Sequence, residues 1–322
     1  MRAIVITRRG GPDVLELQDR PEPDPGPGQL LVQVSAAGVN YRDVYEREGA
    51  SGYTNEPPFV AGVEGAGNVR STGEGVEGFA VGDRVAWLAA PGSYGELVLV
   101  DATRAVPVAD DVSDEQAAAA LLQGVTAQYL STSAYPVREG DSVLVHAAAG
   151  GVGLLLTQMV KQRGGRAIGT TSTEEKARLA RSAGADEVIG YEGFAARTRE
   201  LTGGQGANAV YDGVGRSTFQ ESLDSLRPRG YMVLYGSASG PAPPVEVTRL
   251  AAGSLYLTRP MLAHYTASRA ELLERARAVF GWLVEGGITV TIGGRYPLEE
   301  ARRAHEDLEA RRTTGKLLLV PG

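Results

Sequence analysis

The chain has 322 residues, of which 43% are hydrophobic and 22% charged, and a soft prior of ~150 residues per domain predicts about two globular domains. The formal net charge of −7 disfavours a nucleic-acid or anionic-membrane partner. The absence of cysteine excludes disulfides, thiolate metal sites and cysteine nucleophiles.

The first part of the chain, up to about Arg104, predicts a mostly β domain. Its apolar stretches are short and β-rich, and glycine or proline turns separate AIVI, LLVQV, GNVRS, DRVAWL and GELVLV. The opening MRAIVITRRGG is typical of a strand entering a glycine turn and not of a signal peptide. No apolar run approaches the ~20 residues that cross a bilayer. We therefore expect a cytoplasmic protein without a membrane span.

The middle of the chain predicts an α/β domain. A helix is expected over residues 113–130, interrupted at Gly124, as the bridge into this domain. From Asp141 the strands SVLVHA, RAIGTTS, EVI, NAVYDGV and YMVLYG alternate with helical segments that include FAARTRELTGG and TFQESLDSLRPRG. Buried strands that alternate with crossover helices predict a parallel sheet covered on both faces. This repeat extends to about residue 260.

The residues beyond about 265 return to the style of the first domain. RAELLERARAVFGWLVEGG predicts an amphipathic helix, and KLLLV predicts a final strand. We expect this part to pack onto the first domain. The predicted domains are therefore residues 1–125 with 265–322, and residues 126–264.

A glycine-rich segment, AAAGGVG (147–153), follows an apolar strand and opens a helix, which is the setting of a dinucleotide-binding loop. A pyrophosphate must approach this backbone closely, and a helix N-terminus offers it free N–H groups and the positive end of the dipole. The segment departs from the usual G-x-G-x-x-G pattern in having Ala148 at the first position. The alternative is an ordinary tight turn, which the series of βα units disfavours.

The end of the second strand of the repeat favours NADPH over NADH. An NAD site usually places Asp or Glu ~20 residues after the glycines. Positions 169–173 carry no carboxylate here, whereas Thr171 and Ser172 offer hydroxyls and Lys176 offers a positive charge. These groups attract a 2′-phosphate that a carboxylate would repel. The alternative is that Lys176 is a solvated helix lysine.

Segments along the whole chain resemble the zinc-independent quinone oxidoreductases of the medium-chain dehydrogenase/reductase superfamily, the group that includes zeta-crystallin. The resemblance is carried by segments such as AAGVNYRDVYEREG (36–49), VAGVEGAGNV (60–69), LLQGVTAQYL (121–130) and GDSVLVHAAAGGVGLLLTQMVK (140–161). It implies an α/β fold, with a Rossmann doubly wound parallel sheet plus a GroES-like mostly β domain. It also implies that NADPH lies in the cleft between the two domains.

Zinc-dependent relatives in this superfamily hold their catalytic metal with Cys and His ligands, including the His of a G-H-E motif. The equivalent stretch here is Gly62-Val63-Glu64. Without that histidine or any cysteine, neither a catalytic zinc nor a four-cysteine structural zinc is expected. The expected substrate is a quinone or a related electron-poor carbonyl or enone, which accepts a hydride without a Lewis acid.

The resemblance also implies the site residues, none of them a metal ligand. Asn40, Asp43 and Tyr45 match a segment near the substrate, and Tyr45, or water organised by Asn40 and Asp43, is the expected source of the proton. Asp43 as a helix cap and Tyr45 as a helix-start tyrosine are the alternatives. The expected cofactor-binding residues are Thr126, Ala148, Gly150, Gly151, Val152, Gly153, Thr171, Ser172, Lys176, Tyr191, Gly236, Ser237, Ser239 and Lys316.

Other expectations stay open at this point. His146 ends the strand before the glycines, and we expect it to bond the backbone and not to face the cofactor, because it has no carboxylate or metal partner. An alkene or enoyl reductase of the same superfamily and a non-enzymatic NADPH-binding protein are the alternative functions. From the resemblance, a homodimer is expected to pair at GSLYLTR (253–259).

Overall fold

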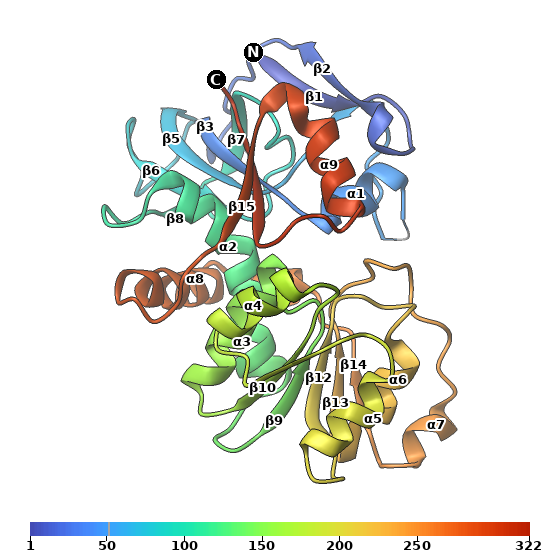
Figure 1. The fold of residues 1–322 in the computed structure, drawn as a ribbon. Helices are drawn as coiled ribbons and strands as arrows, with labels where there is room; N and C mark the ends of the chain where they lie inside the picture. Colours follow the sequence, from blue (N-terminus) through green and yellow to red (C-terminus); the bar gives the residue numbers. More distant parts are fainter. Residues whose placement is uncertain (51) are drawn as a thin grey trace. The chain divides into compact units, whose positions relative to one another are not determined.

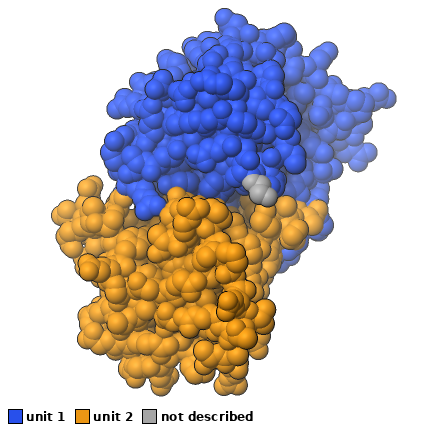
Figure 2. Space-filling model, turned by 90° about the vertical axis from the view of Figure 1, so that its right-hand side faces the viewer, with its two compact units in different colours: residues 1–122, 268–284, 290–322 blue, residues 123–267, 285–289 orange. Residues whose placement is uncertain are grey.

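The computed structural model describes residues 1–50 and 52–322, which form two compact units (Figure 1). Figure 2 draws unit 1 in blue, comprising Met1–Leu122, Ser268–Val284 and Val290–Gly322, and unit 2 in orange, comprising Gln123–Ala267 and Glu285–Thr289. Relative to the domains expected from the sequence, residues 123–125, 265–267 and 285–289 group with unit 2.

Unit 1 is built mainly on β-strands, where short apolar stretches alternate with turns. In the described chain its strands are β1 (Arg2–Ile6), β2 (Leu15–Asp19), β3 (Gln29–Val39), β4 (Phe59–Val60), β5 (Gly65–Thr72), β6 (Arg84–Trp87), β7 (Leu97–Asp101), β8 (Val106–Pro107), β15 (Ile292–Pro297) and β16 (Lys316–Val320). One sheet has the order β2-β1-β4, and the larger one has the order β15-β16-β3-β5-β6-β8 with β7 also paired to β3.

The last strand of the chain lies beside the strand that leads into Asn40. β16 pairs antiparallel with β3, so that Leu318 lies opposite Gly38 and Leu317 opposite Val39. Apolar side chains from both ends of the chain share one buried cluster, which includes Ile4 and Leu319. The C-terminal residues are therefore part of the core of unit 1.

Unit 1 also contains α-helices. They are α1 (Tyr41–Glu48), α8 (Arg269–Val284) and α9 (Ala301–Glu309), together with the first half of α2 (Asp114–Tyr129). α9 packs against β2, β15 and β16. α2 runs through Gly124 without a break, so the predicted interruption there is wrong. A glycine inside a helix lowers helix stability by only ~1 kcal/mol relative to alanine. Gly124 is buried, so packing of this helix in the folded protein outweighs that cost.

Unit 2 contains one parallel sheet. Its strands are β9 (Ser142–Val145), β10 (Arg166–Thr170), β11 (Glu187–Ile189), β12 (Ala207–Asp212), β13 (Leu226–Leu234) and β14 (Tyr256–Thr258). The order β11-β10-β9-β12-β13-β14, with every pair parallel, corresponds to 3-2-1-4-5-6 in chain order. This is the doubly wound order, and it confirms the predicted fold class.

Helices cover both faces of this sheet, α3 and α4 on one face and α5 and α6 on the other (Figure 1). Their bounds are α3 (Gly151–Gln162), α4 (Glu174–Ser182), α5 (Phe194–Leu201), α6 (Phe219–Asp224) and the short α7 (Val247–Ala251). α6 ends earlier than predicted, because Leu226 and the residues after it belong to β13. In a doubly wound sheet the ligand crevice lies outside the carboxyl ends of the strands, where the order reverses between β9 and β12.

None of the helices in the described part of the chain combines the length and the apolar composition that crossing a bilayer requires.

Candidate functional site

The segment 40–43 begins helix α1. Asn40 is extended, with φ −136° and ψ 152°, and its backbone N–H donates to Asp43 Oδ2 at 2.9 Å. This bond satisfies one amide at the helix start, as in a capping box. Asp43 therefore caps the helix, as one of the expected alternatives stated, and this bond holds its carboxyl group beside Asn40.

The side chain of Asn40 is held from three sides inside unit 1. Its Nδ2 donates to Glu64 Oε2 at 2.9 Å and to Gly38 O at 3.2 Å, and its Oδ1 accepts from Lys316 Nζ at 2.8 Å. Both amide hydrogens are used in these bonds. The carboxamide therefore has one orientation and no hydrogen left to give to another group.

Glu64 and Lys316 form an ion pair that is buried almost completely. The atoms Nζ and Oε2 lie 2.5 Å apart, and the side chains are 0% and 1% exposed for Glu64 and Lys316. Glu64 Oε1 also accepts from the backbone N–H of Leu122 at 2.7 Å. A Cβ on Gly38 would lie 2.8 Å from Lys316 Nζ, so a side chain at this position would displace the pair. The predicted cofactor ligand Lys316 thus has its ammonium inside this cluster.

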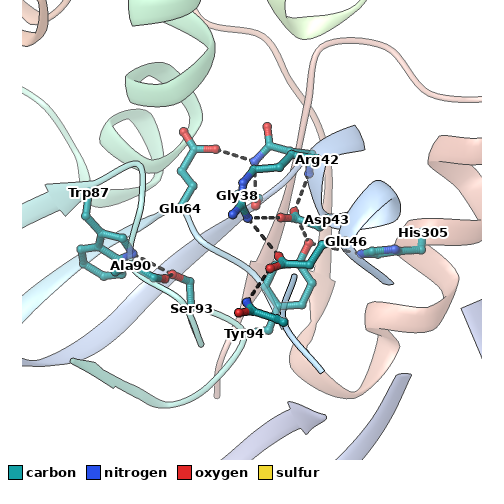
Figure 3. A network of polar contacts seen from close by, with 12 residues as sticks. Gly38, Arg42, Asp43, Glu46, Glu64, Trp87, Ala90, Ser93, Tyr94 and His305 are labelled. Atoms are coloured by element: carbon teal, nitrogen blue, oxygen red, sulfur yellow. Dashed lines mark hydrogen bonds and ion pairs between the residues drawn. The ribbon is translucent and has the colours of Figure 1, made fainter. Parts of the chain in front are cut away.

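Asp43 also stands at the end of a second row of hydrogen bonds, which includes Tyr94 and His305 (Figure 3). Tyr94, from the loop between β6 and β7, donates its hydroxyl to Asp43 Oδ2 at 2.9 Å. Tyr94 Oη lies 3.2 Å from His305 Nε2, and His305 Nδ1 lies 3.0 Å from Arg47 Nη1. Tyr94 and His305 were not predicted, because they are distant from Asp43 in the chain and belong to no recognisable motif.

Burial sets the protonation of this row. Burial raises the pKa of Asp43 to about 6, against the lowering effects of Arg42 and Tyr94. Burial and the positive charge of Arg47 lower the pKa of His305 to about 3. Burial, with the negative charge of Asp43, raises the pKa of Tyr94 well above its usual value. At neutral pH His305 is therefore a neutral imidazole and Tyr94 keeps its proton.

Tyr45, the third predicted catalytic residue, lies in an aromatic group on the same helix. Its half-buried ring lies 6.2 Å from the ring of Tyr41 and 6.2 Å from that of Tyr53, measured between centroids. Tyr53 also lies under the guanidinium of Arg42 at 5.6 Å.

In unit 2, the predicted glycine loop (147–153) connects β9 to α3. The first hydrogen bond of the helix runs from Leu154 N–H to Gly150 O at 2.9 Å, so the amides of residues 151–153 precede it and lack helical acceptors. A Cβ on Gly153 would overlap the carbonyl oxygen of Ala147, which lies across the loop. The loop therefore presents bare backbone N–H groups at a helix N-terminus, which suits a pyrophosphate.

The predicted 2′-phosphate residues lie at the carboxyl ends of β10 and β11. Thr173 caps α4 by accepting the N–H of Lys176 at 3.2 Å, which places the half-buried Lys176 in the first turn of the helix. Thr171 is buried and Ser172 is exposed. The hydroxyl of Tyr191 accepts from the backbone N–H of Ala147 at 3.1 Å. Tyr191 is thus beside the glycine loop.

His146 differs from its expectation, because its ring bonds side-chain hydroxyls and not the backbone. Nδ1 lies 2.9 Å from Thr170 Oγ1, and Nε2 lies 2.9 Å from Ser222 Oγ. Ser222 in turn donates to Asp212 Oδ2 at 3.1 Å. Burial lowers the pKa of His146, so the imidazole is neutral and ties the ends of β9 and β10 to α6.

Asp212 organises the loop after β12 and was not predicted. Its Oδ1 accepts from the backbone N–H groups of Val214 and Gly215, at 2.7 and 2.9 Å. The predicted Ser239 bonds the same loop, because its hydroxyl donates to Val214 O at 2.8 Å. A Cβ on Gly236 would overlap Gly213 O. The loops after β12 and β13 are thus packed against each other.

The other predicted residues also lie in unit 2. Ser237 is half-buried in the segment after β13, and Thr126 is 7% exposed on α2. In the described residues no group of three or more His, Cys, Asp or Glu side chains is arranged to hold a metal ion.

Comparisons with known proteins identify relatives of both unit 1 and unit 2. Residues 26–110 match the family model of the alcohol dehydrogenase GroES-like domain, and residues 151–277 match that of the zinc-binding dehydrogenases. The chain is 45% identical to a quinone oxidoreductase of Pseudomonas aeruginosa, over 99% of each chain. It is 41% identical to a 2-haloacrylate reductase of a Burkholderia species, over 99% of this chain and 98% of the relative. A mycobacterial protein whose structure was determined with NADPH superposes with a TM-score of 0.97 at 52% identity, over 100% of both chains.

The buried ion pair predicts a large loss of stability when one partner is removed. Lys316→Met leaves the Glu64 carboxylate buried without its cation, so we expect the free energy of unfolding to fall by about 3 to 5 kcal/mol. The double variant Glu64→Gln with Lys316→Met recovers most of this loss, because no charge stays buried. The exposed pair Lys161–Asp186 supplies the control, and Lys161→Met costs less than about 1 kcal/mol. A loss in Lys316→Met no larger than in this control, in urea unfolding, contradicts the prediction.

The neutral His305 predicts a stability that depends on pH. The unfolded chain binds a proton at this histidine below about pH 6.5, whereas the native state does not bind it until about pH 3. The difference in the free energy of unfolding between the unmodified protein and His305→Gln is therefore largest above pH 6.5 and shrinks as the pH falls towards 3. Unfolding curves of both proteins at several pH values measure it. A difference that stays constant across this range shows that His305 is not buried as a neutral group.

Proposed function

The chain belongs to the quinone oxidoreductases of the medium-chain dehydrogenase/reductase superfamily, and we propose that it reduces quinones or related electron-poor carbonyl and enone acceptors with NADPH. The observation that carries this proposal is the bare glycine loop, followed by residues 169–173 at the end of β10, which include the hydroxyls of Thr171 and Ser172 and no carboxylate, and by Lys176 in the first turn of α4. Bound NADPH supplies a hydride to the acceptor.

The residues of unit 2 fit the phosphates of NADPH. We propose that the amides of residues 151–153 bind the pyrophosphate and that Thr171, Ser172 and Lys176 bind the 2′-phosphate. Tyr191 lies beside the glycine loop through its bond to Ala147, and it completes this set. The negative 2′-phosphate meets donors and a cation here, which favours the phosphorylated cofactor. Thr126, Gly236, Ser237 and Ser239 are proposed to contact the rest of the cofactor.

Unit 1 supplies the residues that we propose for the acceptor: Asn40, Asp43 and Tyr45. Asn40 has both amide hydrogens bonded to Glu64 and Gly38, so its role is to orient neighbouring groups and not to give up a proton. Lys316 contributes indirectly, because its ammonium binds Asn40 and Glu64. We propose it as a positioning residue, in place of the direct cofactor contact expected from the resemblance.

A second acceptor class is an activated alkene, since one relative of this chain is a 2-haloacrylate reductase. Hydride addition to an alkene conjugated to a carboxylate or carbonyl uses the same cofactor and also consumes a proton. A cytoplasmic location and a homodimer are further parts of the proposal. The dimer is supported by β14, an edge strand of the sheet on which Tyr256 is 51% exposed.

The proposed activity predicts NADPH oxidation with simple quinones. We expect absorbance at 340 nm to fall when NADPH, a 1,4-benzoquinone or naphthoquinone and the protein are combined, and EDTA to leave the rate unchanged. A parallel series with 2-haloacrylates and alkenals identifies the acceptor class. Turnover of the alkenes alone assigns the second candidate. Binding of NADPH without oxidation by any acceptor contradicts an enzymatic function.

Lys176 predicts cofactor selectivity. A charge-assisted bond to the 2′-phosphate is worth enough that Lys176→Ala should weaken NADPH binding about tenfold or more and leave NADH binding nearly unchanged. Arg178→Ala removes an exposed cation from the same helix and should change neither. Calorimetric titrations with both cofactors measure these effects. Equal weakening of NADH and NADPH binding in Lys176→Ala means that this lysine does not bind the 2′-phosphate.

A further inference from the structure

The row of hydrogen bonds behind Asp43 has a direction that its chemistry dictates. A guanidinium can only donate, so Arg47 Nη1 donates to His305 Nδ1, and Nδ1 carries no hydrogen. The single hydrogen of this neutral imidazole then lies on Nε2 and is donated to Tyr94 Oη. Tyr94 therefore donates its own hydrogen to Asp43 Oδ2.

This direction makes the two oxygens of Asp43 different. Oδ2 accepts from Tyr94 and from the backbone N–H of Asn40, so both of its bonds require an unprotonated oxygen. Oδ1 is buried and has no hydrogen-bond partner. A proton bound by Asp43 must therefore reside on Oδ1.

We propose that Tyr94 and His305 are positioning residues that hold Asp43 so that its exchangeable proton lies on Oδ1, and that they thereby set the charge of this buried carboxyl group beside Asn40. The effect on turnover rests on the function proposed above. Hydride transfer places negative charge on the acceptor, so the neutral form of Asp43 favours this step more than the carboxylate does.

The charges around Asp43 make such a proton available near neutral pH. From α1, the Arg42 guanidinium lies 3.9 Å from Oδ1 and favours the carboxylate. Lys316 on β16 acts in the same direction, but its ammonium is bound to Glu64. Arg42 is itself bound to Glu46 at 3.0 Å. With both cations paired to other carboxylates, burial dominates and holds the pKa of Asp43 at about 6.

The direction of the row is tested first in the unmodified protein. The ¹⁵N shifts of the His305 ring at pH 7, assigned with His305→Gln, should show a hydrogen on Nε2 and none on Nδ1. A hydrogen on Nδ1, or a doubly protonated ring, reverses or breaks the row and overturns the proposal. This measurement needs no cofactor or acceptor.

The second test follows the carboxyl ¹³C signal of Asp43 against pH, assigned with Asp43→Asn. We expect a pKa near 6, and Tyr94→Phe should raise it by about one unit, because the carboxylate loses a hydrogen bond that favours its charged form. Ser93→Ala is the matched control. It removes a buried hydroxyl of the same loop, which bonds Trp87 and Ala90 and not Asp43 (Figure 3). An Asp43 pKa near 4, or equal values in both variants, overturns the proposal.

The third test is the pH profile of kcat with a quinone. We expect kcat to fall as the pH rises through the pKa that the carboxyl titration gives, and this limb should move upward in Tyr94→Phe and stay in place in Ser93→Ala. A limb that does not follow the Asp43 pKa overturns the proposed effect of Asp43 on turnover. Absence of all turnover refutes the proposed function, whereas the two NMR measurements still decide the arrangement of Asp43, Tyr94 and His305.

Discussion

The buried contact between Lys316 and Glu64 is the constraint on which the arrangement around Asn40 depends. Two opposite charges removed from water are stable only while they remain together and their other hydrogen-bonding positions are filled. Here Asn40 and the amide of Leu122 fill positions on Glu64, and Asn40 also accepts from Lys316. The pair therefore holds Asn40 in place. Helix α1 begins directly after Asn40, and Asp43 in its first turn accepts from the Asn40 N–H.

The same contact gives the buried carboxylate of Glu64 a positive partner from within the chain. This chain has Val63 where zinc-dependent relatives have the His of their G-H-E motif, and it has no cysteine. The ammonium of Lys316 supplies the positive charge that a buried carboxylate requires. An ammonium does not polarise a substrate oxygen as a Lewis acid does, which agrees with acceptors that are already electron-poor.

In unit 2 the polar groups of interest are backbone amides and not charged side chains. The glycine loop and the first turn of α3 offer amides that lack helical acceptors, and we propose these amides for the pyrophosphate of NADPH. The neutral His146 bonds the hydroxyls of Thr170 and Ser222, and Ser222 donates to Asp212. These hydrogen bonds join the carboxyl ends of β9, β10 and β12 to α6 beside the proposed phosphate site.

The features that are local or periodic could be predicted from the amino-acid pattern alone. The alternation of strands and helices predicted the doubly wound sheet, and the glycine loop was placed because a strand, a glycine cluster and a helix follow one another within about twenty residues. The composition also determined that a cysteine-ligated zinc is impossible. Gly124 shows the limit of local reasoning, since its helix propensity argued for a break that packing removed.

Contacts between side chains that are far apart in the chain depend on how the folded elements pack. Lys316 reaches Glu64 across 252 positions, and Tyr94 reaches His305 across 211. No periodicity or motif records such contacts, because they depend on how β16 and α9 pack against β3 and α1. The protonation of Asp43 and His305 likewise follows from burial, which exists only once the whole of unit 1 has folded.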